Sequence, residues 1–254
     1  MKMHLMRRID FVVGVPVCYV LAILHYIRKI IPFQHTRNTI KKILVVKFLG
    51  IGSIILTTPA IAAMRDNYPD AKIYYLTFKQ NKGIIDFLGN TQKQFYVDSS
   101  TFFKFCMTLL RSVWNIRREK IDLMFDFEFF SKLSLIVGAL GNIRQRAGFY
   151  LVSEWWRRKL LTFHGYYNHY YHVKDIFLSL VYLVRSGDPY YIKFKGYQER
   201  YLLPTITLSS ELLERAREIF HTAGVDLSKR VVAINPNAGP ELSPSLKKWP
   251  RPQE

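Results

Sequence analysis

Apolar residues recur along the chain in short runs separated by stretches with helical spacing. Residues 41–50 (KKILVVKFLG) form one such run, which ends in glycine and is typical of a strand buried on both faces of a parallel sheet. The same pattern predicts further strands at 71–78, 94–97, 122–127 and 146–151, and helices at 54–67, 83–88, 102–120, 130–140, 175–185 and 209–223. Strands that alternate with helices predict an α/β domain with a parallel sheet and right-handed crossovers.

An uncharged segment lies near the amino terminus. Residues 11–27 (FVVGVPVCYVLAILHYI) carry no charge, and basic pairs flank them on both sides. The length is at the short end of the ~17 to 25 residues that span a membrane, and Gly14 and Pro16 weaken a straight helix. A helix lying in the membrane interface is an equal alternative, and a core helix of a soluble domain is a third. We expect residues 1–38 to form a membrane-associated helix and a basic linker.

The carboxy-terminal half changes character twice. Residues 154–174 mix cations with Trp, Tyr and His, which indicates either a surface facing sugar, phosphate or lipid headgroups, or an amphipathic hairpin with snorkelling cations. Residues 186–204 read as a loop between domains. A strand at 230–235, followed by a glycine-containing loop, predicts the start of a second α/β domain. We therefore divide the rest of the chain into a Rossmann-like domain at 39–205 and an incomplete second domain at 206–254.

The basic net charge of the chain indicates a class of binding partner. The 254 residues contain 37 Lys and Arg against 19 Asp and Glu, which gives a formal net charge of +18 and indicates an anionic neighbour. The cations are spread along the chain without a nucleic-acid-binding signature, so an anionic membrane surface or a sugar phosphate is favoured over nucleic acid.

Cysteine and histidine spacing argues against a metal centre. Cys18 and Cys106 lie far apart and form no CxxC motif, so we interpret them as reduced residues of a protein that faces the cytosol. His164, His169 and His172 lie close in sequence, but no acidic or thiol ligand stands at metal spacing around them. We expect no metal site.

The turn after the first predicted strand is the most informative segment. It carries Gly50 and Gly52 and leads into a helix, whose free amide groups could bind an anion or a polar sugar group. Dinucleotide enzymes use a similar turn with the pattern GxGxxG, but Ile55 stands where the third glycine belongs. A nicotinamide-binding role is therefore disfavoured, and we expect no cofactor.

Several spaced motifs together carry a family resemblance. The strand is followed by Lys-x-x-Gly-x-Gly-Ser, an aliphatic run and Thr-Thr-Pro-Ala at 57–60, and then by Tyr-Pro-Asp. Later matches are DLMFDFE at 122–128, RAGF at 146–149, VAINPNAG at 232–239 and KKWP at 247–250. This order resembles the family 9 glycosyltransferases, the ADP-heptose:lipopolysaccharide heptosyltransferase-like group, from about residue 41 onward.

The resemblance implies a GT-B fold, in which two Rossmann-like domains face each other across a cleft. The first domain would bind a lipopolysaccharide or lipid-linked glycan acceptor, and the second a nucleotide-sugar donor such as ADP-heptose. The chemistry would be inverting and independent of metal and cofactor, at the cytoplasmic face of the bacterial inner membrane. Because residues 206–254 would supply only the start of the donor domain, we expect this chain alone to be inactive.

Site residues transfer from the family with one departure. The family's proposed base is an acidic residue directly after the glycine of the first loop, where this chain has Ser53. A serine hydroxyl does not replace a carboxylate of pKa ~4 as a proton acceptor unless another base activates it. We therefore expect Asp126 or Glu128 to take the proton, with a helix cap and a solvated surface group as their respective structural alternatives. The acceptor loop would be shaped by Gly50, Gly52, Thr57 and Thr58.

The donor side rests on residues near the end of the chain. By the resemblance, Lys247 would contact the donor phosphates, with an exposed loop lysine as the alternative. Asn235, Asn237 and Gly239 would shape the loop around the donor. Two other function classes stay open: a membrane-bound binding module that has lost catalysis, which Ser53 permits, and a nucleic-acid-binding protein, which only the basic charge suggests.

Overall fold

A computed structural model describes residues 3–30, 39–89, 91–129, 131–150, 154–188, 199–201, 208 and 210–232. The chain divides into two compact units, residues 1–205 and residues 206–254. Each unit is described by itself below.

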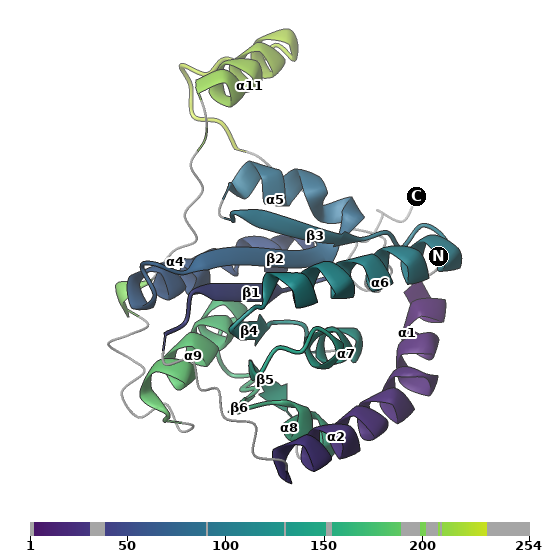
Figure 1. Ribbon diagram of the computed structural model, residues 1–254. Helices are drawn as coiled ribbons and strands as arrows, with labels where there is room; N and C mark the ends of the chain where they lie inside the picture. The colour runs from purple at the N-terminus through teal and green to yellow at the C-terminus, as the bar shows by residue number, and fades with distance from the viewer. Residues whose placement is uncertain are drawn as a thin grey trace. The chain divides into compact units, whose positions relative to one another are not determined.

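The first unit is built on a sheet of six parallel strands (Figure 1). The strands are β1 (Lys42–Val46), β2 (Lys72–Phe78), β3 (Lys93–Val97), β4 (Leu123–Asp126), β5 (Gln145–Tyr150) and β6 (Phe163–Tyr166). Their order across the sheet is β3-β2-β1-β4-β5-β6. The predicted α/β class and the five strands predicted between residues 41 and 151 are confirmed. The sixth strand, β6, was not predicted and lies inside the 154–174 segment.

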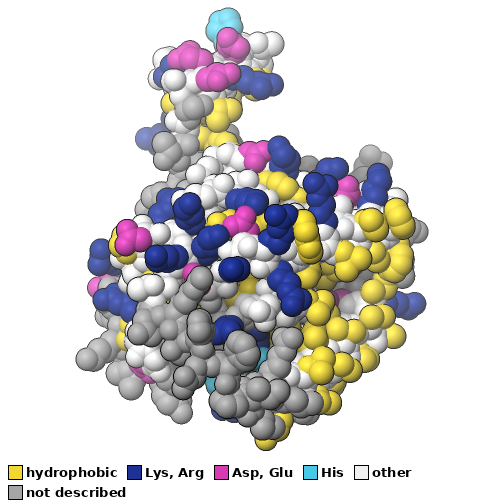
Figure 2. All heavy atoms as spheres, in the orientation of Figure 1, with side chains coloured by type: hydrophobic (Ala, Val, Ile, Leu, Met, Phe, Trp, Pro, Cys, Tyr) yellow, Lys and Arg dark blue, Asp and Glu magenta, His cyan; other side chains and the backbone are white. Residues whose placement is uncertain are grey.

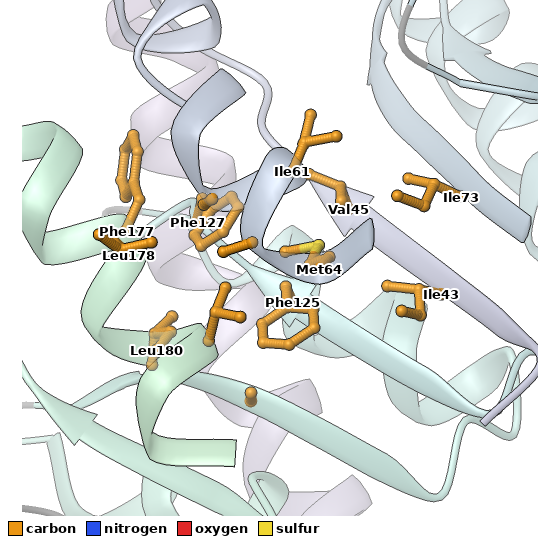
Figure 3. Packing of buried hydrophobic residues seen from close by; sticks show 14 of the residues in the cluster. Ile43, Val45, Ile61, Met64, Ile73, Phe125, Phe127, Phe177, Leu178 and Leu180 are labelled. Atoms are coloured by element: carbon orange, nitrogen blue, oxygen red, sulfur yellow. The ribbon is translucent and has the colours of Figure 1, made fainter. Parts of the chain in front are cut away.

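Helices cover both faces of the sheet. On one face, α4 (Thr58–Asn67) and α9 (Val173–Ser186) pack on the odd-numbered side chains of β1, such as Ile43 and Val45 (Figure 3). On the other face, α6 (Phe102–Glu119) and α7 (Leu133–Leu140) pack on Leu44 and Val46. Both faces of β1 are therefore buried, as its unbroken apolar run predicts. The remaining helical segments of this sheet region are α3 (Ile51–Ile55), η1 (Lys79–Asn81), α5 (Lys82–Leu88) and α8 (Trp155–Leu160).

The helical character predicted for 54–67 is confirmed, but the structure divides this stretch between two helices. Helix α3 ends at Ile55 and α4 begins at Thr58, with Pro59 in the first turn of α4. Proline has no N–H to donate to the preceding turn, and its ring clashes with the carbonyl four residues earlier, so one continuous helix is disfavoured. The break places α3 beside the end of β1 as a separate short element.

The amino-terminal segment packs along the side of the first unit. It forms α1 (Met3–Val12) and α2 (Gly14–Ile30). Cys18 and Ala22 of α2 are buried against Leu135 of α7, Trp156 and Leu160 of α8, and Leu161 directly after α8. Among the described residues, the segment Arg8–Tyr26 is long and apolar enough to cross a membrane, with a mean hydropathy of 1.9. One side of the same segment also packs against the domain, through Cys18 and Ala22.

The second unit is described only in part. Helix α11 (Ser210–Thr222) matches the helix predicted at 209–223, and none of its side chains is buried. Residues 230–232 are not in a strand, and residues 233–235 of the predicted strand lie outside the described residues.

Candidate functional site

The candidate site lies where β1 and β4 end side by side. These strands pair in parallel, with Val46 opposite Asp126. The chain continues from β1 to β2 on one side of this pair and from β4 to β5 on the other. In open α/β sheets, the crevice at the carboxyl ends of two strands whose connections diverge in this way is the usual ligand position. The sheet therefore brings the loop after β1 and the loop after β4 together.

Glu128 ties these two loops to each other. Its Oε2 accepts hydrogen bonds from Lys47 Nζ at 2.9 Å and from the backbone N–H groups of Phe48 and Leu49, both at 3.0 Å. The alternative that Glu128 is a solvated surface group is wrong, because its side chain is 1% exposed. Its other oxygen, Oε1, is buried and has no hydrogen-bond partner among the described residues. Glu128 thus holds the first loop with one oxygen and leaves the second unused.

Asp126 is fully buried two residues earlier. Its Oδ2 accepts from Ser134 Oγ at 2.8 Å and lies 3.6 Å from Arg157 Nη2, and its Oδ1 accepts from the backbone N–H of Glu128 at 3.0 Å. Burial raises the pKa of Asp126 to about 6, although Arg157 and Ser134 act in the opposite direction. The Asp126 carboxylate therefore accepts a hydrogen bond from a side-chain hydroxyl within α7 and does not cap that helix. The backbone amides at the start of α7 donate instead to Asp10.

Arg157 completes the site and was not predicted. It comes from α8, is 0% exposed, and donates to the carbonyl oxygens of Phe149 (3.0 Å), Ser131 (3.3 Å) and Glu128 (3.4 Å). Lys47, Asp126, Glu128 and Arg157 thus form a buried charge cluster with two cations and two anions. In the sequence, Arg157 stands in WWRRKL, and nothing in that run distinguishes the buried cation from its exposed neighbours.

The glycine loop sits directly beside this cluster. Gly50 has a φ of +83°, a conformation that side-chain-bearing residues rarely adopt, and a Cβ at this position would lie 3.1 Å from Ser53 Oγ. Gly52 faces open space. Ser53 is half-buried in α3, one turn after the backbone that Glu128 holds. Asn81, which sequence reasoning missed, supports the same loop by donating to the carbonyl of Phe48 at 2.7 Å.

Both predicted threonines are buried behind the loop. Thr57 Oγ1 donates to the carbonyl of Ile54 at 2.7 Å, and Thr58 Oγ1 donates to the carbonyl of Ile55 at 2.9 Å. Their hydroxyls therefore satisfy the last carbonyls of α3 and shape the turn into α4.

The predicted donor-binding residues and the side chains that could ligate a metal remain to be placed. Lys247, Asn235, Asn237 and Gly239 lie outside the described residues. In the described part of the chain, no group of three or more His, Cys, Asp or Glu side chains could hold a metal ion.

Comparison with known proteins bears on the fold. No family model and no curated protein sequence matches this chain. Among solved structures, a glycosyl transferase family 9 protein from Veillonella parvula DSM 2008 superposes with a TM-score of 0.60 at 16% identity, over 76% of this chain and 52% of that chain. The ADP-heptose LPS heptosyltransferase II of E. coli superposes with a TM-score of 0.55 at 14% identity, over 73% and 51%. The chain thus spans about half the length of these structures. It has the α/β fold of the family 9 glycosyltransferases that the sequence motifs resemble.

Proposed function

We propose that this chain contributes the acceptor domain of a glycosyltransferase. The enzyme would transfer a heptose-like sugar from a nucleotide-activated donor to lipopolysaccharide or a related cell-envelope glycan. The observation that carries the proposal is the buried charge cluster at the ends of β1 and β4, beside the glycine loop, in a sheet with the fold of family 9 glycosyltransferases. The structurally similar E. coli protein is an ADP-heptose LPS heptosyltransferase, which supports the proposed classes of donor and acceptor.

The proposed reaction is an inverting displacement. The acceptor hydroxyl oxygen attacks the anomeric carbon of the donor sugar, the bond from that carbon to the diphosphate oxygen breaks, and the nucleoside diphosphate leaves with the bonding electrons. The hydroxyl proton passes to a carboxylate of the protein. Lys247 offsets the negative charge that develops on the diphosphate. No metal or cofactor takes part in this scheme.

Glu128 is our first choice for the base and Asp126 is the second. The unbonded Oε1 of Glu128 can accept a proton without giving up an existing hydrogen bond, whereas both oxygens of Asp126 already accept one. The Oε2 of Glu128 contacts Lys47 Nζ at 2.9 Å, so its carboxyl group is held beside the loop that carries Ser53. Removal of a general base lowers turnover by roughly a hundredfold to ten-thousandfold.

The test is a transfer assay with the protein expressed from its whole reading frame. ADP-heptose and heptose-deficient lipopolysaccharide are the probes, and ADP release and product mass are measured. Glu128→Gln is expected to lower kcat at least about a hundredfold. Because it also removes the charge that pairs with buried Lys47, kcat is measured at a temperature where circular dichroism shows the variant to be folded. Asp86→Asn, an exposed carboxylate on α5, is the matched control. Near-normal kcat in both Glu128→Gln and Asp126→Asn would refute the assignment of the base.

A non-catalytic binding module is the second candidate. It is favoured by Ser53 in the place of the family's acidic residue and by the internal bonds of Asp126 and Glu128. This candidate predicts that the protein binds the glycan acceptor without releasing ADP from any ADP-sugar. Ser53→Asp restores the carboxylate and should raise transfer only if the remaining machinery is intact.

We also propose attachment of residues 1–38 to the cytoplasmic face of the bacterial inner membrane. The apolar segment Arg8–Tyr26 and the net charge of +18 support this location. Deletion of residues 1–33 should move the protein from the membrane to the soluble fraction. Identical partitioning of the deletion variant and the intact chain would refute this attachment.

A further inference from the structure

Helix α6 carries an apolar stripe on its outer surface. Phe103, Met107, Leu110 and Trp114 recur at intervals of four, three and four residues, so they share one face of the helix. Each side chain is more than half exposed, from 54% for Met107 to 74% for Phe103. The opposite face of α6 already packs on the sheet through residues that include Phe105, Leu109, Val113 and Ile116. The outer stripe is therefore additional to what the fold requires.

Cations border this stripe. Lys104, Arg111 and Arg118 are exposed and recur every seven residues, which places them along one side of the stripe. The guanidinium of Arg118 lies over the Trp114 ring, 4.5 Å from its centroid. No acidic residue occurs in α6 before Glu119 at its last position. Aromatic and aliphatic side chains beside cations, without acids, are the pattern of a helix that lies in the interface of an anionic membrane.

The amino-terminal helices present a second apolar surface. Phe11, Val12, Val20, Ile23 and Leu24 are each at least half exposed, while the other side of α2 is buried on α7 and α8. Figure 2 shows hydrophobic side chains gathered on the side of the molecule where α1, α2 and the beginning of α6 lie in Figure 1. Two apolar helix surfaces thus share one side of the first unit.

Asp10 argues against a membrane crossing by this segment. Its carboxylate accepts from the backbone N–H groups of Lys132 and Leu133, at 2.9 and 3.2 Å, and from Ser131 Oγ at 3.0 Å. These contacts bond the free amides at the start of α7. A helix that crossed the bilayer would have to leave them, and would carry an unpaired carboxylate next to its apolar run. The buried side of α2 would also lose its protein contacts.

We infer that α6 and the outer side of α1 and α2 form one membrane-binding surface that rests on an anionic phospholipid bilayer, with α2 parallel to the membrane plane. The apolar stripe of α6 enters the acyl boundary, and Lys104, Arg111 and Arg118 meet the lipid phosphates. This inference deepens the proposed membrane attachment and does not depend on sugar transfer. It adds α6 as a binding element and excludes a transmembrane arrangement.

Vesicle flotation tests the contribution of α6. The intact chain, purified in mild detergent, is mixed with phosphatidylcholine vesicles with or without phosphatidylglycerol. The variant Phe103→Ser/Leu110→Ser/Trp114→Ser should lower partitioning at least about tenfold, and Lys104→Gln/Arg111→Gln should lower it only on phosphatidylglycerol vesicles, by roughly fivefold per charge. Ile219→Ser/Phe220→Ser, two exposed residues of α11, is the matched control. Unchanged binding of the triple variant would overturn the role of α6, even if deletion of residues 1–33 abolished binding.

Two measurements separate the remaining alternatives. An epitope tag before Met1 and the sheet domain should both be digested by protease added to inverted inner-membrane vesicles, because a helix in the membrane plane leaves both on one side. Digestion of the domain with protection of the tag would show that α2 crosses the membrane and overturn the inference. The apolar surface of α6 could instead bind a second copy of the chain, which light scattering of the triple variant tests. If the substitutions abolish a dimer but leave vesicle binding unchanged, the inferred membrane-binding surface would also be overturned.

Discussion

Arg157→Met is the sharpest test of the buried charge cluster. Methionine retains much of the volume of the arginine stem but removes the guanidinium, which donates to three backbone carbonyls and faces Asp126 at 3.6 Å. Removal of one partner of a buried ion pair costs about 3 to 5 kcal/mol, because the remaining charge stays buried without compensation. We expect this loss in the free energy of unfolding at pH 7.5.

The pH dependence identifies Asp126 as the source of that loss. Burial raises the pKa of Asp126 from its ordinary value of 3.8 to about 6 in the folded chain, so protonation favours the folded state. Without Arg157, the cation that lowers this pKa is gone, and the folded pKa rises further. The ionised form therefore costs more as pH increases, and the difference between Arg157→Met and the parent should be smaller at pH 5.5 than at pH 7.5.

Urea unfolding followed by circular dichroism measures both quantities. Asp126→Asn/Arg157→Met removes the unpaired carboxylate as well, so it should be more stable than Arg157→Met at pH 7.5. Arg158→Met, an exposed neighbour on α8, should change stability by only about 1 kcal/mol or less. If Arg157→Met costs less than about 1 kcal/mol, or the same amount at both pH values, the cluster does not hold the strand ends in the way argued above.

Two further perturbations probe the loop and the helix contact. Gly50→Ala should lower the free energy of unfolding by about 1 to 2 kcal/mol, because a φ of +83° strains a residue with a Cβ. Urea unfolding measures this loss, and Gly52→Ala, where a Cβ meets open space, is the control. Asp10→Ala should destabilise the start of α7 by about 1 to 2 kcal/mol, because two backbone amides lose their acceptor. Hydrogen exchange at Lys132 and Leu133 should then accelerate, and unchanged exchange would show that Asp10 does not bond them in solution.

Much of the sheet could be predicted because its strands are apolar runs bounded by turn residues. The run in β1 and the alternation with helices are sufficient for the parallel α/β class. Strand β6 could not be predicted in the same way, since Phe163–Tyr166 (FHGY) is short, polar at His164 and interrupted by glycine. It forms because the edge of β5 offers unpaired backbone groups, which is a tertiary cause that local sequence does not contain.

The candidate site divides in a similar way. Asp126 and Glu128 could be proposed because the family-like run DLMFDFE at 122–128 places two carboxylates at the end of a predicted strand. Their burial could not be predicted, because it depends on Arg157, about 30 residues later, and on Lys47, about 80 residues earlier. Which of the consecutive cations Arg157, Arg158 and Lys159 turns inward depends on how α8 packs on β5, not on residue type.

The contact of α2 with α7 and α8 has a consequence for synthesis. Cys18 and Ala22 leave the ribosome well before Leu135 and Trp156, their packing partners, exist. At about 5 to 20 residues per second, the interval of more than a hundred residues lasts several seconds to roughly half a minute. Throughout that time the nascent segment has apolar side chains on every side and no protein surface to cover them. Under the proposed membrane attachment, the lipid bilayer would shield the segment before its own domain can, and the order of emergence from the ribosome would bring the chain to the membrane before the sheet is complete.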